Sequence, residues 1–197
     1  MKKSVIYSLS AVILASTLSG CSLTGEPETE STSVPTYKPA AEICILDDYA
    51  LLAGHTLFTG ADDAYSIQIP EGSTINNEDP DNITITINGE FDSADFVNII
   101  HTDNATVIDT EQKLMDMLEN DNSIDITGFF LLKMNGEYKG YKYTYTATQD
   151  PQLKGIKSTY FSSDGTAYVV TATINNGGDE INMTNINTVV DTFINNR

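Results

Sequence analysis

Strict alternation of apolar and polar residues is the feature that most limits how this chain can fold. In "YSIQIP" (65–70) and "NITITING" (82–89), β-branched or aromatic side chains recur at every second position. This period predicts strands with one buried face and one exposed face. We expect further strands at "ADFVNIIHT" (94–102), "FFLLKM" (129–134), "YKYTYTAT" (141–148), "IKSTYF" (156–161) and "AYVVTATI" (167–174).

Turn residues lie between these segments. Asn135-Gly136 and Asp164-Gly165 each separate two strand patterns, and Asn88-Gly89 precedes a third, with extra residues that suggest a bulge. Asn-Gly and Asp-Gly are the preferred pairs of type I′ hairpin turns. The sheet is therefore expected to be mostly antiparallel.

Two segments have helical periodicity. In "DTEQKLMDMLEN" (109–120), Asp109 is the expected N-cap, with Gln112 at capping-box spacing. Leu114, Met117 and Leu118 would share its buried face. In "DEINMTNINTVVDTFINN" (179–196), the apolar stripe is Met183, Ile186, Val190 and Phe193.

Together these elements predict an α+β domain with a mostly antiparallel sheet of about six to eight strands covered by helices. Phe193 is expected to be substantially buried against that sheet. Residues 42–54 are compatible with either a helix or a strand.

The segments "YSIQIPEGS" (65–73) and "VVDTFI" (189–194), with this order of elements, resemble the PsbP-like fold over residues 55–196. That fold is an α/β/α sandwich found in photosystem II extrinsic proteins, a small Ran-binding protein and many bacterial lipoproteins. The resemblance implies a binding or assembly module and supplies no catalytic residues. A periplasmic lipid-carrier half-barrel is the alternative fold, and it would need more strands.

The N-terminus predicts a lipid anchor. Residues 1–20 have a positive start and a short apolar run, as in a secretory signal peptide. They lead into Leu18-Ser19-Gly20-Cys21, which resembles the lipobox of bacterial lipoproteins, where the Cys takes a diacylglycerol and becomes the first residue. A secreted protein with a chance Cys near its cleavage site is the alternative.

This anchor fixes the expected domain organisation. Residues 21–41 would be the lipidated Cys and a disordered tether, because they are rich in Ser, Thr, Pro and Glu. Residues 42–197 would form one domain, held at the outer face of the bacterial cytoplasmic membrane. The only other cysteine, Cys44, lies between isoleucines and is interpreted as a small buried hydrophobe.

Charge excludes several partners. Without the signal peptide, 8 basic and 28 acidic residues remain. Nucleic acids need a cationic binding surface, so they are excluded, as is direct adsorption to anionic lipid. A bound cation, a basic partner such as an envelope protein, or a role in solubility alone remains compatible with this charge.

The acidic loops are the candidate metal ligands. Glu78, Asp79 and Asp81 cluster around a proline, and Asp62 and Asp63 lie in an earlier turn. Calcium is the ion that clustered carboxylates suit, although solvated turns are the interpretation we favour.

Catalytic motifs are absent from the sequence. His55 and His101 are the only histidines, and no nucleophile elbow, zinc-protease motif or phosphate-binding loop occurs. We interpret His101 as structural. We expect no cofactor.

The tyrosines on the predicted strands have two possible interpretations. Tyr141, Tyr143 and Tyr145, with Tyr160 and Tyr168, would form either an exposed strip for a glycan or partner, or core beneath a helix. We favour the core.

These observations predict a lipid-anchored binding or accessory module without catalytic activity. The alternatives are an envelope hydrolase and a calcium-dependent binding lipoprotein. A hydrolase would place His55 or His101 in a pocket with a nucleophile or an acidic pair.

Overall fold

The computed structural model describes residues 40–44, 50–88, 95–119, 121–175 and 180–197, without the side chains of 44, 88 and 180–185. The chain divides into two units, residues 1–35 and 36–197, and every described residue belongs to the second. The predicted signal peptide, Cys21 and most of the tether lie outside the described residues. In the described part, no helix has the length and apolar character needed to cross a membrane.

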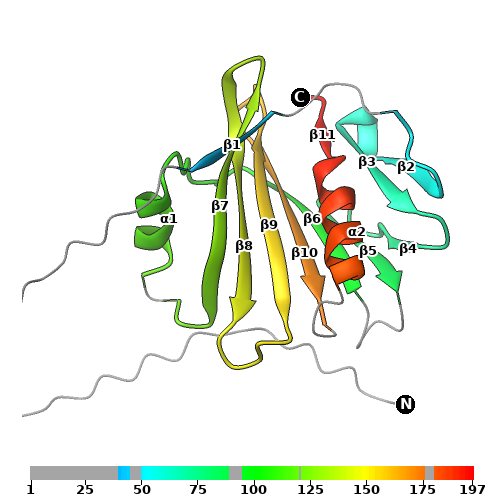
Figure 1. Cartoon of the computed structure of the whole chain (residues 1–197). Coiled ribbons are helices and arrows are strands. Elements are labelled where there is room, and N and C mark those ends of the chain that lie inside the picture. The colour runs from blue at the N-terminus through cyan, green and yellow to red at the C-terminus, as the bar shows by residue number, and fades with distance from the viewer. Residues whose placement is uncertain (1–39, 45–49, 89–94, 120, 176–179) are drawn as a thin grey trace, which may run out of the picture. The chain divides into compact units, whose positions relative to one another are not determined.

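An eight-stranded sheet forms most of the described domain (Figure 1). In spatial order its strands are β1 (Ala41–Cys44), β7 (Ile124–Met134), β8 (Glu137–Ala147), β9 (Lys154–Phe161), β10 (Ala167–Ile174), β6 (Asp95–Thr102), β5 (Asn82–Asn88) and β4 (Thr74–Asn76). Only the β1–β7 pair is parallel, so the prediction of a mostly antiparallel sheet is confirmed. The segment that was compatible with helix or strand thus begins as a strand.

A second, three-stranded sheet contains β11 (Ile194–Asn195), β3 (Tyr65–Pro70) and β2 (His55–Thr59). This sheet and helix α2 (Glu180–Asp191) contribute to one apolar core with a face of the large sheet. The core includes Ile85, Ile99, Ile156 and Val170, each less than 2% exposed. One face of the large sheet is therefore covered partly by a helix and partly by strands.

The opposite face has much less cover. Helix α1 (Glu111–Met117) places Leu114 in a second cluster with Phe129, Tyr141 and Tyr143. On β6, Ile100 remains 38% exposed. The expectation of a sheet covered by helices was thus wrong in extent: the described residues form a mostly β domain with two α-helices.

Four of the five tyrosines in the predicted group belong to the core, on two different faces, and Tyr145 is partly buried against the α1 cluster. Tyr141 and Tyr143 lie in the α1 cluster, whereas Tyr160 and Tyr168 lie in the α2 cluster. All four are at most 4% exposed. A single exposed aromatic strip is therefore ruled out, because the register of β8 and β9 places Tyr141 opposite Thr159 and Tyr160 opposite Gly140.

Helix α1 begins one residue later than its predicted cap. Thr110, not Asp109, is the N-cap, and its hydroxyl accepts a hydrogen bond from the Lys113 amide at 3.2 Å. Asp109 instead pairs with the Lys113 ammonium at 2.7 Å. Met117 is 43% exposed and does not share the buried face of Leu114, because this short helix turns only a narrow stripe towards the sheet.

The predicted C-terminal helix was too long. Helix α2 ends at Asp191, because the next residues leave it to pair with β3: Ile194 lies opposite Ser66 and Asn195 opposite Tyr65. Phe193 therefore lies beyond the helix, yet it is fully buried, as expected. The side chain of Met183 lies outside the described residues.

The β7–β8 turn has the type I′ conformation that its Asn-Gly pair predicts, whereas the β9–β10 turn does not. Asn135 and Gly136 both have positive φ, 53° and 82°, as a type I′ turn requires. In the β9–β10 turn only Gly165 does, and Asp164 accepts a hydrogen bond from the Thr166 amide at 3.0 Å instead. The β5–β6 pairing carries an irregularity between Thr86 and Asn88, and residues 89–94 of its connection are not described.

We predict that Phe193→Ala will lower the free energy of unfolding by about 3–5 kcal/mol, because a buried aromatic side chain is lost and a cavity remains. Leu57→Ala is the control, since Leu57 is 59% exposed. It should change stability by less than about 0.5 kcal/mol. Urea unfolding measures both, and equal shifts would contradict the placement of Phe193.

Candidate functional site

A pocket of about 200 Å³ opens where the two sheets meet, and we call it the His101 pocket. Its lining residues include Asp62, Tyr65, Asp81, His101, Tyr168 and Arg197. They come from the turn before β3, from β3, the β4–β5 turn, β6, β10 and the C-terminal segment. Two predicted metal ligands and one of the two histidines thus share one pocket.

One wall is a tight turn. In the 3-10 turn η1 (Ala61–Asp63), Asp62 and Asp63 have φ of 54° and 55°, a left-handed conformation that Asp adopts more readily than most residues. The amide of Gly60 donates to the carbonyl of Tyr65 at 2.9 Å. A Cβ on Gly60 would lie 2.3 Å from the Tyr65 ring, so only glycine lets this ring lie against the turn.

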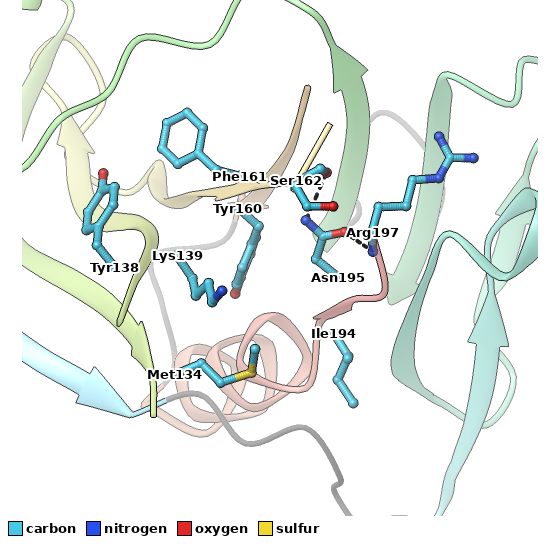
Figure 2. Close-up of a pocket in the computed structure, with 10 residues that line it drawn as sticks. Met134, Tyr138, Lys139, Tyr160, Phe161, Ser162, Ile194, Asn195 and Arg197 are labelled. Atoms are coloured by element: carbon cyan, nitrogen blue, oxygen red, sulfur yellow. Dashed lines mark hydrogen bonds between the residues drawn. The ribbon is translucent and has the colours of Figure 1, made fainter. Parts of the chain in front are cut away.

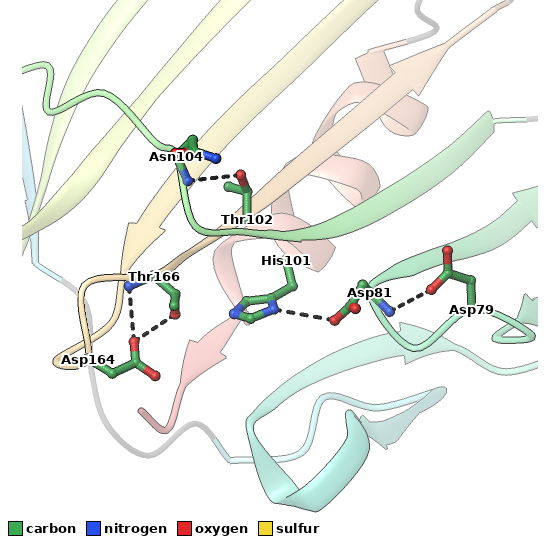
Figure 3. A network of polar contacts seen from close by, with 7 residues as sticks. All are labelled: Asp79, Asp81, His101, Thr102, Asn104, Asp164 and Thr166. Atoms are coloured by element: carbon green, nitrogen blue, oxygen red, sulfur yellow. Dashed lines mark hydrogen bonds and ion pairs between the residues drawn. The ribbon is translucent and has the colours of Figure 1, made fainter.

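His101 is held by Asp81 through two contacts. The backbone amide of His101 donates to the Asp81 carbonyl at 3.0 Å, and Nδ1 of the ring lies 3.3 Å from Oδ1 of Asp81 (Figure 3). Asp79 supports this turn by accepting from the Asp81 amide at 3.0 Å. Since a carboxylate only accepts, Nδ1 carries the proton in this contact, and Nε2 of a neutral ring is an acceptor.

Two buried polar atoms of the lining lack hydrogen-bond partners among the described residues. They are Nε2 of His101 and the hydroxyl oxygen of Tyr65, whose residue is only 2% exposed. Buried polar groups are nearly always paired, and leaving one unpaired costs stability. Unpaired groups in a pocket therefore indicate a site that is completed by something else.

Aromatic rings form the floor of the pocket. The ring centroids of Tyr65 and Tyr168 are 5.0 Å apart, as are those of His101 and Tyr168. Burial, and then the neighbouring Tyr168, raises the pKa of Tyr65 to about 12. Both tyrosines therefore stay neutral at physiological pH and contribute hydroxyl groups rather than charge.

Charge in the pocket is mixed. Burial raises the pKa of Tyr168, Arg197 opposes this shift, and Asp164 and Asp81 add to it. Arg197, Asp164 and Asp81 are therefore close enough to Tyr168 to interact with it electrostatically. The two lining carboxylates, Asp62 and Asp81, outnumber the single guanidinium of Arg197.

A second pocket, of about 190 Å³, lies between the β7–β8 hairpin, the end of β9 and the C-terminal segment. Its walls include Met134, Tyr138, Phe161 and Ile194 (Figure 2). Figure 2 shows the Lys139 amino group pointing into it, whereas the Arg197 side chain extends away. It is more apolar than the His101 pocket, and its lining contains no carboxylate side chain among the described residues.

The other predicted metal ligands do not join the His101 pocket. Asp63, Glu78 and Asp79 lie in the same two turns as Asp62 and Asp81 but are not part of its lining. Among the described residues, no three His, Cys, Asp or Glu side chains are arranged to hold a metal ion. Calcium binding stays a prediction.

His55 lies away from the other histidine. It starts β2 opposite Pro70, at the far end of β3 from Tyr65, and its Nδ1 lies 3.0 Å from the carbonyl oxygen of Ala53. The two histidines therefore do not form one site. Cys44 ends β1, and its side chain lies outside the described residues.

Sequence reasoning missed Tyr65, Tyr168 and Arg197 as pocket residues. Tyr65 begins the "YSIQIPEGS" segment, whose pattern indicates packing, and Tyr168 was grouped with the wrong tyrosines. Gly60, five residues before Tyr65, is a position where a ring can pack directly against the backbone. A glycine in the sequence does not, however, identify which ring packs there.

No protein-family model matches the sequence, and no curated protein matches it significantly. Among solved structures, the chain is similar to cyanobacterial PsbP from Synechocystis, with 12% identity over 73% of this chain and 93% of that chain and a TM-score of 0.49. It is also similar to the Ran-binding protein Mog1p of Saccharomyces cerevisiae, with 8% identity over 72% and 95% of the two chains and a TM-score of 0.45. These similarities are of fold alone, and no ligand, partner or residue role follows from them.

We predict that Tyr65→Phe will raise the free energy of unfolding by about 1 kcal/mol, because it removes a buried hydroxyl that has no partner. Tyr160→Phe is the matched control. Its hydroxyl donates to the Val190 carbonyl at 3.3 Å, so its loss should lower stability by about 1 kcal/mol. Chemical denaturation measures both. A loss of stability in Tyr65→Phe equal to the control would mean that the Tyr65 hydroxyl is paired.

Proposed function

We propose that this chain is a lipid-anchored, extracytoplasmic binding or accessory module without catalytic activity, and that the His101 pocket is its binding site. The observation that carries the binding role is the pair of buried, unpartnered polar atoms on Tyr65 and His101. A pocket that only filled space would gain stability from apolar groups at these positions. Retaining polar groups there at a cost to stability is expected of a functional site.

The anchor rests on the N-terminal sequence. Leu18-Ser19-Gly20-Cys21 follows a short apolar run with a positive start, and two acyl chains on one Cys would give stable membrane attachment. Residues 22–41 would act as the tether that holds the domain away from the head groups.

Replacing the lipidated residue tests the anchor. Cys21→Ser should move the protein from the membrane fraction to the medium or leave it as an unprocessed precursor, because serine cannot form the thioether. Fractionation and the mass of the N-terminal peptide measure this. Cys44→Ser is the control, and it should stay in the membrane fraction. A Cys21→Ser protein that is processed and remains membrane-bound like wild type would exclude the lipoprotein assignment.

Purification from membranes tests the binding role. Wild-type protein should retain a small molecule or an envelope protein that the double variant Tyr65→Phe/His101→Ala loses, as detected by mass spectrometry. Asp125→Asn is the control, because Asp125 is exposed on β7, four strands away from β6 in the sheet. If wild type and the double variant retain the same components, the pocket is not the binding site.

An envelope hydrolase is the second candidate, favoured by one observation. His101 contacts Asp81 and shares its pocket with Asp62, so it meets the condition of a histidine beside an acidic pair. In that role His101 would be a general base towards water, held by Asp81. No Ser, Thr or Cys belongs to the described lining, so a serine- or cysteine-hydrolase mechanism has no nucleophile there. A hydrolase would lose its turnover in His101→Ala, whereas a binding module has no turnover to lose.

A further inference from the structure

We propose that the His101 pocket binds a primary ammonium group, carried by a small amine or by the lysine side chain of a partner. This inference rests on the proposed binding role of the pocket and specifies its ligand. It follows from two properties of the lining: buried polar atoms without partners among the described residues, and an excess of carboxylates.

The acceptors come first. In the neutral form of His101, the contact between Nδ1 and Asp81 places the ring proton on Nδ1, and the unpartnered Nε2 is then an acceptor. Figure 3 shows the Nε2 edge of the ring pointing away from Asp81. The unpartnered Tyr65 hydroxyl also accepts, and an ammonium group has three donors and no acceptor. The two kinds of group are complementary.

Charge selects the same ligand. Asp62 and Asp81 line the pocket, and Asp164 is near enough to act on the Tyr168 hydroxyl. An anionic ligand would face these carboxylates, whereas a cation would be attracted by them.

Arg197 is the group that opposes this ligand. It is an exposed cation in the same lining. Its charge lowers the pKa of Tyr168, whereas Asp164 and Asp81 raise that pKa. The Tyr65 hydroxyl and His101 Nε2 are both closed to water, so a ligand reaches them only when a side chain at the pocket mouth moves. As the one cation in the described lining, Arg197 would compete with the ammonium group for the carboxylates.

The test is an NMR titration of the His and Tyr ring resonances of the domain at constant ionic strength. The probes are n-butylammonium, Nα-acetyl-lysine amide, butyrate and calcium chloride. Either amine should cause saturable shifts at His101, Tyr65 and Tyr168, whereas butyrate should not. Tighter binding of the acetyl-lysine amide would assign the ammonium to a partner's lysine, and tighter binding of butylammonium would assign it to a free amine.

Three variants make the assignment specific. Asp62→Asn should weaken amine binding about tenfold by removing a charged acceptor. Asparagine tolerates the left-handed conformation of this position, so the turn should be kept. Asp125→Asn makes the same charge change on β7 and should leave the affinity unchanged. Arg197→Gln should strengthen binding severalfold, because it removes the competing cation.

Three results would overturn the proposal. Saturable binding of butyrate without amine binding, weakened by Arg197→Gln, would show an anion site. Saturation by calcium with no response to either amine would show a metal site. In both cases a binding role for the pocket would survive. An absence of saturable shifts with every probe would overturn the ammonium assignment, and the binding role would then fail only if the membrane purification also shows no difference.

Discussion

The burial of the Phe193 ring is the interaction on which the rest of this domain depends. Its centroid lies 4.6 Å from that of Tyr160, 5.2 Å from Tyr65 and 5.9 Å from Tyr168. These three rings come from β9, β3 and β10, so one side chain joins the small sheet to the large one. Aromatic contacts of this kind add directional attraction to the area that they bury. Because Tyr65 and Tyr168 also line the His101 pocket, the same cluster sets the position of the pocket floor.

The uneven cover of the large sheet explains where a site can form. On one face, α2 and the small sheet cover the strands together, and the described lining of the His101 pocket comes from the two sheets and the segments beside them, not from α2. The His101 pocket lies at the end of β3, β6 and β10, where the β4–β5 turn and η1 supply loop carboxylates. Loops on a rigid sheet are the usual carriers of binding groups. Two buried, unpartnered polar atoms, those of Tyr65 and His101, thus lie beside loop carboxylates in one pocket.

The few basic residues of this acidic domain have distinct positions. Lys142 is buried on β8, pairs with Asp191 at 2.5 Å and lies 5.7 Å from the centre of the Phe130 ring. It therefore joins the end of α2 to the large sheet, and its charge is compensated within the fold. Arg197 is exposed and lies beside carboxylates of different loops. The first cation thus links two elements of the fold, whereas the second is exposed in the lining of the His101 pocket.

The sequence alone was enough to predict the strands, because alternation along 65–70, 82–88 and 141–147 is a local property that the fold keeps. It also placed Phe193 in the core and indicated antiparallel pairing through Asn135-Gly136. It did not indicate which face of each strand packs against α1 and which against α2. Tyrosines from two different faces were therefore grouped together, and the burial of Lys142 was not predicted. Only the tertiary structure decided that α2 ends before Phe193, because that end depends on pairing with β3, more than 120 residues earlier. The pocket has the same origin: Asp62, Asp81, His101 and Arg197 are distant in sequence, and only the packing of the two sheets brings them together.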